Sequence, residues 1–276
     1  MFEIHQFNHA AMATHFQARI SSGEKAYAAQ AAQAVFDLLD SLESRLSRFR
    51  THSDIARIAD LAPGETMRLS EPAFACLQIA KLMEKSTQRA FCSTPAALKS
   101  QTSLPHWELV PSEQSILCVS GRLDFDLGAI GKGFALDRMA ELLRHWECCS
   151  FLLVAGGSSI LAGDRPPNAL GWSCGLGEDN SSQRFFLTRA SLSGSGLAVK
   201  GSHILDPRSG QTASRQNRAW VLADTASESD ALSTACMVLN ELEVENVFAQ
   251  NDSWLALLET EDGVRPIGRR VLPMKA

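Results

Sequence analysis

Apolar residues recur every three or four positions along residues 24–48, which predicts a long amphipathic helix with one buried face. A second helix is predicted to begin after Ser70, a suitable N-cap, with Pro72 in its first turn. The same spacing predicts helices at about 133–146 and 228–239, the second of them followed by a shorter helix.

Short apolar or alternating runs predict the strands. Residues 115–120 and 122–127 are expected to be neighbouring strands joined by a tight turn at Gly121. Residues 150–163 are expected to form a buried strand broken by paired glycines. Further strands are expected at 171–176, 183–188, 219–224 and 253–259, the last closing the fold. Helices and strands mix without strict β-α-β alternation, so the predicted class is α+β, with mainly antiparallel sheets and flanking helices.

Composition narrows the class of protein. The 276 residues carry a net charge of −5 without long runs of like charge, which argues against a nucleic-acid or anionic-membrane surface. No stretch approaches the ~20 apolar residues of a membrane span, and no linker or repeat divides the chain. We therefore expect one cytoplasmic domain, 1–276. The seven cysteines form no C-x-x-C pair, which favours free thiols over a zinc site.

The segment "DFDLGAIGKGFALDR" at 124–138 places a glycine-rich turn directly before a predicted helix. Such a turn exposes backbone N–H groups at the positive end of a helix, where anions such as phosphates bind. Its spacing matches neither a Walker A loop nor a G-x-G-x-x-G dinucleotide motif. A glycine turn without a ligand is the alternative interpretation.

Two further segments carry candidate chemistry. In "SDALSTA", Asp230 and Thr234 are four residues apart, so a helix would place both oxygens on one face, as a Mg²⁺ site requires. The alternative is an ordinary helix start, with Ser227 or Ser229 as the N-cap and Asp230 in the first turn. In "GSHILDPRSG", His203 lies near the end of a predicted strand and is either a proton carrier or a partly exposed strand residue.

Taken together, these segments resemble the ApbE family of flavin transferases, in the same order along nearly the whole chain. "MATHFQARI" is similar to the family's M-G-T strand, and "LESRLSRFRTHSDIARIA" to its S-x-Y and S-E-[IL] helices. "DLGAIGKGFALD" resembles D-L-G-G-I-A-K-G-Y-A-x-D, and "VAGGSSILAG" resembles N-L-G-G-[ND]-I. "SLSGS", "HILDPRSG" and "SDALSTA" resemble S-G-D-Y, H-[IL]-[IL]-D-P-[RK]-T-G and A-D-[AG]-L-[SA]-T.

The resemblance implies an ApbE-like fold around a flavin-nucleotide cleft, and Mg²⁺-dependent transfer of FMN from FAD to a Thr or Ser hydroxyl of a flavoprotein, with AMP released. The implied Mg²⁺ ligands are the Ala129 carbonyl, Asp230, Thr234 and Ser233. Asp230 and His203 would be catalytic, with His203 near the reacting pyrophosphate and accepting the hydroxyl proton. The implied FAD-binding residues are Met12, Phe49, Ala90, Phe91, Cys92, Asp126, Lys132 and Ile204.

Several positions depart from the family pattern. Cys92 replaces an acidic residue of G-A-F-D-[PA]-T, Phe49 replaces the tyrosine of S-x-Y, and Ala59 replaces an asparagine. After S-G, Ser195 and Gly196 stand where the family has Asp and Tyr. A non-catalytic FAD-binding protein and an FAD pyrophosphatase giving FMN and AMP are therefore the alternatives to a transferase.

Overall fold

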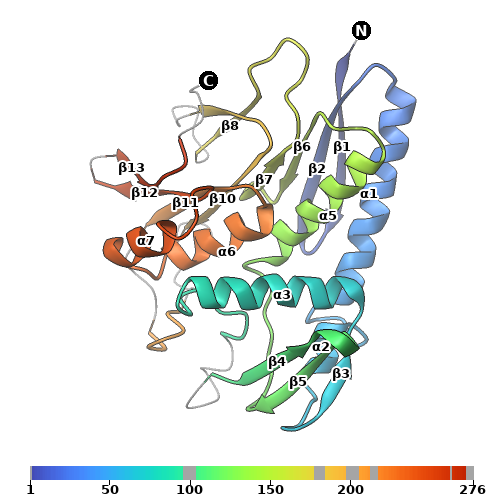
Figure 1. Cartoon of the computed structure of the whole chain (residues 1–276). Helices are drawn as coiled ribbons and strands as arrows, with labels where there is room; N and C mark the ends of the chain where they lie inside the picture. Colours follow the sequence, from blue (N-terminus) through green and yellow to red (C-terminus); the bar gives the residue numbers. More distant parts are fainter. Residues whose placement is uncertain are drawn as a thin grey trace.

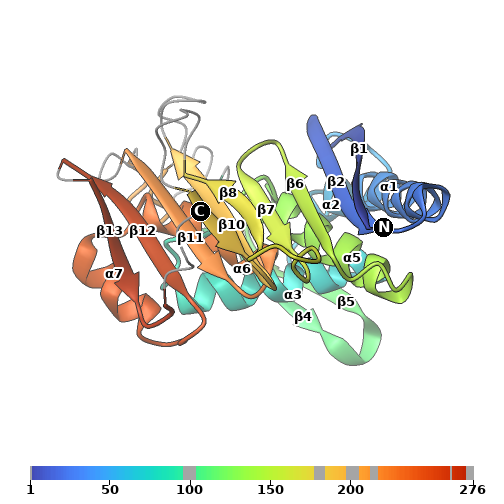
Figure 2. The ribbon, with the colours of Figure 1, turned by 90° about the horizontal axis from the view of Figure 1, so that it is seen from above.

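The computed structural model describes residues 2–95, 104–176, 184–196, 205–211, 217–261 and 263–271. Its centre is an eight-stranded sheet in the order β1-β2-β6-β7-β10-β11-β12-β13, in which every neighbouring pair is antiparallel (Figure 2). The strands of this sheet are β1 (Glu3–Ala11), β2 (Thr14–Ser22), β6 (Phe151–Ala155), β7 (Ser159–Ala162), β10 (Ala190–Gly196), β11 (Arg218–Ala223), β12 (Leu255–Thr260) and β13 (Gly263–Gly268).

Helices cover one face of this sheet (Figure 1). The helices of the described residues are α1 (Lys25–Leu46), α2 (Asp54–Ile58), α3 (Glu71–Ser86), α5 (Gly131–His145), α6 (Ala226–Cys236) and α7 (Glu241–Phe248). Successive residues of a strand point to opposite faces. Leu153 and Val221 accordingly pack in the main core on the helix side, whereas their neighbours Leu152 and Leu222 pack in a second core on the other side.

The second core is covered by a hairpin of β8 (Trp172–Gly175) and β9 (Arg184–Leu187). Its inward residues, Trp172, Cys174, Phe185 and Leu187, pack on the sheet residues of the second core. The eight-stranded sheet therefore has a helical side and a hairpin side, each with its own packed core.

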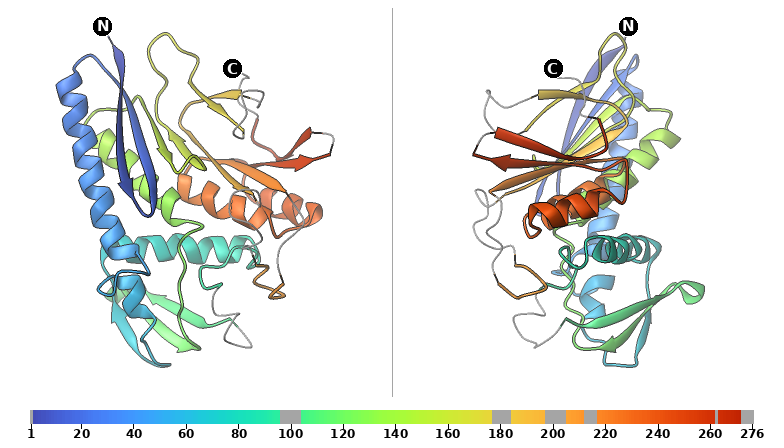
Figure 3. Two further views of the ribbon diagram at one scale, coloured as in Figure 1. Left: turned by 180° about the vertical axis from the view of Figure 1, so that it is seen from behind. Right: turned by 60° about the vertical axis from the view of Figure 1, so that its left-hand side comes forward.

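A smaller sheet lies beyond α3, at the end of the molecule that α1 reaches with its C-terminus (Figures 1 and 3). It consists of β3 (Thr66–Arg68), β5 (Ser115–Ser120) and β4 (His106–Val110), in the order β3-β5-β4. Trp107 and Ile116 from this sheet belong to the same core as the helices of the large sheet. One continuous core thus joins the two sheets.

The predicted fold class, α+β with mainly antiparallel pairing, is confirmed. The predicted helices and the strand at 115–120 are present, with the hydroxyl of Ser70 capping α3. The prediction of a closing strand at 253–259 is wrong in one respect, since β13 follows it and pairs with β12. Among the described residues, no helix is both long and apolar enough to cross a membrane.

The prediction of a strand at 122–127 is wrong. Leu123 and Phe125 are buried, as the alternation indicated, but the segment pairs with no strand of the described chain. The N–H of Asp126 instead donates to the carbonyl of Ser93 at 2.7 Å. Alternating burial occurs here without a β-ladder, because the segment runs as an extended connection from the small sheet to α5.

Candidate active site

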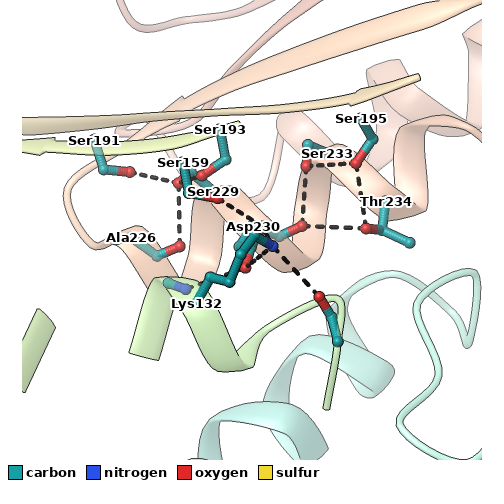
Figure 4. Close-up of polar contacts among 12 residues, drawn as sticks. Lys132, Ser159, Ser191, Ser193, Ser195, Ala226, Ser229, Asp230, Ser233 and Thr234 are labelled. Atoms are coloured by element: carbon teal, nitrogen blue, oxygen red, sulfur yellow. Dashed lines mark hydrogen bonds and ion pairs between the residues drawn. The ribbon is translucent and has the colours of Figure 1, made fainter. Parts of the chain in front are cut away.

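The carboxylate of Asp230 is the centre of a buried polar cluster on α6 (Figure 4). The ammonium of Lys132 lies 3.2 Å from each of its two oxygens. The N–H of Gly133 donates to Oδ2 at 3.1 Å, and the hydroxyl of Ser159 donates to Oδ1 at 3.1 Å. The Asp230 side chain is only 5 % exposed, against 21 % for Lys132. A nearly buried negative charge is thus compensated by a cation, a backbone donor and a hydroxyl.

The glycine-rich turn predicted from the sequence delivers two of these donors. Helix α5 begins at Gly131, so Lys132 and Gly133 lie in its first turn, where backbone N–H groups lack partners within the helix. The Lys132 ammonium also donates to the carbonyl of Gly128 at 3.4 Å. The cation therefore lies among two carboxylate oxygens and one carbonyl oxygen.

Gly133 allows α5 and α6 to approach each other. A Cβ added at this position would lie 2.1 Å from the carbonyl oxygen of Ala226, a contact that real Cβ atoms do not make. Asp137, one turn further along α5, accepts from the N–H groups of Ala226 and Ser227 and from the Ser227 hydroxyl. Burial raises the pKa of Asp137, although these three donors oppose the shift. Asp137 holds the start of α6, and with it Asp230, against α5.

The N-cap of α6 differs from the residues that the sequence suggested, Ser227 or Ser229. The N-cap is Thr225, whose hydroxyl accepts from the N–H of Glu228, and neither Ser227 nor Ser229 has that role. Ser227 instead donates to Asp137, and the hydroxyl of Ser229 lies against Ser191 and Ser193. The sequence could not show these contacts of Ser227 and Ser229, because their partners lie on α5 and β10, far away in the chain.

Serines of β10 face α6 across a hydroxyl network (Figure 4). The hydroxyl of Ser195 lies 3.0 Å from that of Ser233 and 3.4 Å from that of Thr234. Both α6 hydroxyls also donate to the carbonyl of Asp230, at 2.9 Å from Ser233 and 3.3 Å from Thr234. The Ser195, Ser233 and Thr234 hydroxyls therefore lie close together, and the two α6 hydroxyls are directed at the backbone carbonyl of Asp230.

A second group of the predicted residues gathers around Asp126. Its Oδ1 accepts from the N–H of Gly128 at 2.9 Å, which shapes the glycine turn, and its Oδ2 accepts from Arg48 at 2.8 Å. The Arg48 guanidinium also lies 5.4 Å from the ring centre of Phe49, which is 86 % exposed. An exposed aromatic ring beside the glycine turn is a suitable stacking surface for a planar ligand.

The 90–94 segment is joined to Asp126, whose N–H donates to the Ser93 carbonyl. The buried carboxylate of Glu84 accepts from the N–H and the hydroxyl of Ser93, at 2.9 and 2.6 Å. Ala90 and Phe91 are buried in the main core, so their side chains are part of the scaffold. Cys92 is partly buried, and burial together with the Glu84 charge raises the pKa of its thiol.

Met12 occupies the β1–β2 turn and not the interior of an opening strand. Its φ is 50° and that of Ala13 is 56°, and the side chain packs against the main core. The following strand places His15 beside the β6–β7 turn, where the N–H of Gly156 donates to the His15 carbonyl at 2.9 Å. That turn leads to Ser159, so Met12 lies at the same end of the sheet as the Asp230 cluster.

His203 and Ile204 lie outside the described residues, and their roles stay predictions. Ala129 packs against the main core. The carbonyl that accepts from the Lys132 ammonium is that of Gly128, one residue earlier. The structure thus connects Asp126, Lys132, Asp230, Ser233 and Thr234 through the glycine turn and α6.

The ApbE family model matches residues 12–258, which is most of the chain. The chain belongs to the ApbE family.

Among the ApbE relatives, a FAD:protein FMN transferase of Klebsiella pneumoniae is 25 % identical over 171 residues, covering 55 % of this chain and 48 % of the relative. The FAD:protein FMN transferase of Salmonella typhimurium is 26 % identical over 175 residues, with 56 % and 49 % covered. The chain thus spans about half the length of the curated relatives it matches.

Solved structures support the same fold. The flavin transferase ApbE from Vibrio cholerae superimposes with a TM-score of 0.83 at 18 % identity, over 96 % of this chain and 97 % of that one. The apo flavinyl transferase ApbE from Pseudomonas stutzeri gives 0.82 at 20 % identity, over 96 % and 94 %. At these identities the likeness establishes the ApbE fold alone.

Sequence reasoning missed three residues that build this site, namely Ser159, Asp137 and Glu84. Asp137 closes the "DLGAIGKGFALD" signature, so its place there was an available signal. Ser159 stands in "VAGGSSILAG", where the motif that it resembles carries isoleucine. Glu84 lies in a helix far from any motif, and only the fold shows that it holds Ser93.

Proposed function

We propose that this chain transfers FMN from FAD to a Thr or Ser hydroxyl of a flavoprotein in a Mg²⁺-dependent reaction that releases AMP. Family membership and the names of the relatives support flavin transfer. The observation that carries the proposal is the Asp230 cluster, in which one buried carboxylate holds a cation beside a glycine-rich helix start. Phosphoryl-type transfer depends on positioning and on charge neutralisation, which such a cluster offers.

The oxygen atoms near Asp230 fit Mg²⁺. Mg²⁺ is commonly held by one or two carboxylates, with waters and substrate phosphates completing the shell. In the described part of the chain, no three His, Cys, Asp or Glu side chains gather as a metal site, so a Mg²⁺ site built on Asp230 would depend largely on hydroxyl, carbonyl, water and phosphate oxygens. Asp230 would bind the ion, with the Thr234 and Ser233 hydroxyls and the Ala129 carbonyl as further ligands. When bound, Mg²⁺ would neutralise charge developing on the pyrophosphate.

Other residues of the chain would bind FAD and accept the proton. Phe49 would stack on a ring of FAD, and Asp126 would hold the glycine turn in shape through the Gly128 N–H. Met12, Cys92 and Ile204 would line the remainder of the FAD site. Ala90 and Phe91, whose side chains are buried in the core, would contribute through their backbone. Lys132 would place its positive charge on a phosphate oxygen. The acceptor hydroxyl would attack the phosphorus of the FMN half, the bond to AMP would break, and His203 would accept the hydroxyl proton.

The test combines the purified protein with FAD, Mg²⁺ and candidate flavoprotein acceptors. Intact mass of the acceptor reports covalent FMN, and chromatography reports AMP. Transfer predicts both products in equal amounts. AMP and FMN without modified acceptor would support the pyrophosphatase alternative. Neither product, with FAD still bound, would support the non-catalytic alternative.

Single substitutions test the proposed roles of these residues. Asp230→Asn should abolish both products, a loss on the order of 10²-fold or more, since it removes the charge that would hold the metal. Asp60→Asn is the matched control, because it makes the same substitution at an exposed aspartate. Phe49→Ala should weaken FAD binding without altering Mg²⁺ binding. Equal turnover by Asp230→Asn and Asp60→Asn would refute the assignment.

A further inference from the structure

A cavity of about 630 Å³ lies on the hairpin side of the eight-stranded sheet, bordered by β1, β2 and β6 and by the β8–β9 hairpin. Asp230 lies on the other side, because α6 packs in the main core with the remaining helices. The volume falls within the roughly 300–1,000 Å³ of small-molecule sites. Nothing in the proposed flavin chemistry uses this cavity.

The walls of the cavity combine apolar and polar side chains. The apolar ones include Phe2, Ile4, Leu152, Pro166, Pro167 and Trp172. The polar ones are Gln6, Arg19, Ser21, Ser173 and Arg184. Phe2 and Ile4 are 65 % and 54 % exposed, so both leave apolar surface in contact with water. An apolar molecule in the cavity would remove these side chains from water.

Two arginines from different elements line the same cavity, Arg19 from β2 and Arg184 from β9. Arg19 donates through Nε to the Gln17 amide oxygen at 2.6 Å. Arg184 donates to the hydroxyl of Ser173 at 3.0 Å and to its carbonyl at 3.5 Å. Within the described ranges neither arginine forms an ion pair with a carboxylate, unlike most other arginines of the chain.

Both guanidinium groups border the one cavity, from walls formed by β2 and by the hairpin. Burial raises the pKa of the nearby Cys174 thiol to about 12, and the positive charges of Arg184 and Arg19 oppose this rise. A guanidinium carries five N–H donors, and the contacts above use only a few of them. Unused donors on two cations that line the same cavity favour an anion.

We propose that this cavity binds an amphiphilic anion, whose apolar body contacts the Phe2, Ile4 and Trp172 wall while its carboxylate or phosphate head is held by Arg19 and Arg184. The apolar wall alone would accept any oily molecule. The two arginines select one with a negative head, since both carboxylate and phosphate match the fork of a guanidinium. This site is separate from the proposed flavin site.

The experiment uses isothermal titration calorimetry with decanoate and decyl phosphate, each below the concentration at which it forms micelles. Decanol, which has the same chain without charge, is the ligand control. The protein is the whole chain, as wild type, as Arg19→Gln/Arg184→Gln, and as Arg57→Gln/Arg68→Gln. The last variant removes two exposed arginines of α2 and β3, and so matches the change in net charge. Each titration is repeated with saturating FAD.

We expect wild type and the Arg57/Arg68 variant to bind at least one anion equally, and the Arg19/Arg184 variant to bind it at least tenfold more weakly, with FAD changing neither result. The tighter of decanoate and decyl phosphate identifies the head group. Three results would each overturn the proposal: no binding of either anion, equal binding of decanol, or equal binding by the two double variants. Displacement by FAD would overturn it as well, because it would place the anion in the flavin site.

Discussion

Lys132→Met tests the view that the Lys132 ammonium occupies the cation position of the Asp230 cluster. The substitution keeps an unbranched side chain of similar length and removes the charge. Of the donors among the described residues, Asp230 would then keep the Gly133 N–H and the Ser159 hydroxyl. With its side chain 5 % exposed, the carboxylate could not recover the lost interaction from bulk water.

The magnitude follows from this geometry. Removing one partner of a buried ion pair costs about 3–5 kcal/mol. Here Lys132 is 21 % exposed and two other donors remain on Asp230, so the loss should be smaller, about 2 kcal/mol. Mg²⁺ should then return stability to the variant. A ligand at 100 times its dissociation constant stabilises a folded protein by about 2.7 kcal/mol.

The assay is urea unfolding followed by tryptophan fluorescence, with EDTA or with Mg²⁺. In EDTA, Lys132→Met should be less stable than wild type. In Mg²⁺ it should gain more than wild type does, because the ion need not displace an ammonium. Lys85→Met, at an exposed position on α3, is the control and should show neither effect. Equal stability of Lys132→Met and wild type in EDTA, or an equal gain from Mg²⁺, would refute the reasoning.

Three further predictions test the surroundings of the site. Gly133→Ala should destabilise the fold by about 3 kcal/mol or more in urea unfolding, because its Cβ would meet the Ala226 carbonyl at 2.1 Å; a loss below 1 kcal/mol would show that α5 and α6 separate easily. Burial raises the pKa of Asp137, so the stabilisation that its protonated form contributes is complete below about pH 4 and is lost as the pH rises through the pKa of the folded state. An asparagine cannot ionise, so the free energy of unfolding of Asp137→Asn, relative to wild type, should increase from pH 4 to pH 7. A constant difference would contradict this. Cys149 is the exposed cysteine, so a thiol reagent should modify one site rapidly in the native protein, and none in Cys149→Ser.

The sequence by itself determined the long helices, part of the strands and the candidate chemistry. Three- and four-residue periodicity predicted the helices, because burying one face of a helix requires that spacing and no knowledge of its partner. Asp230 and Thr234 were identified in the same way, since the helix alone places their oxygens together. The order of the motifs was sufficient to indicate the ApbE family, which the family match confirms.

Only the tertiary structure decided what these residues contact. Lys132 and Asp230 are 98 positions apart, and Ser159 and Asp230 are 71 apart, so no local pattern could pair them. Residues 122–127 show the same limit, because alternation predicts which side chains are buried but not whether a neighbouring strand is present to form a ladder. The hairpin-side cavity had no signal at all in the sequence, because Arg19 and Arg184 are brought to it by strands far apart in the chain. Local periodicity reports burial, whereas a binding site depends on which distant surfaces the core brings together.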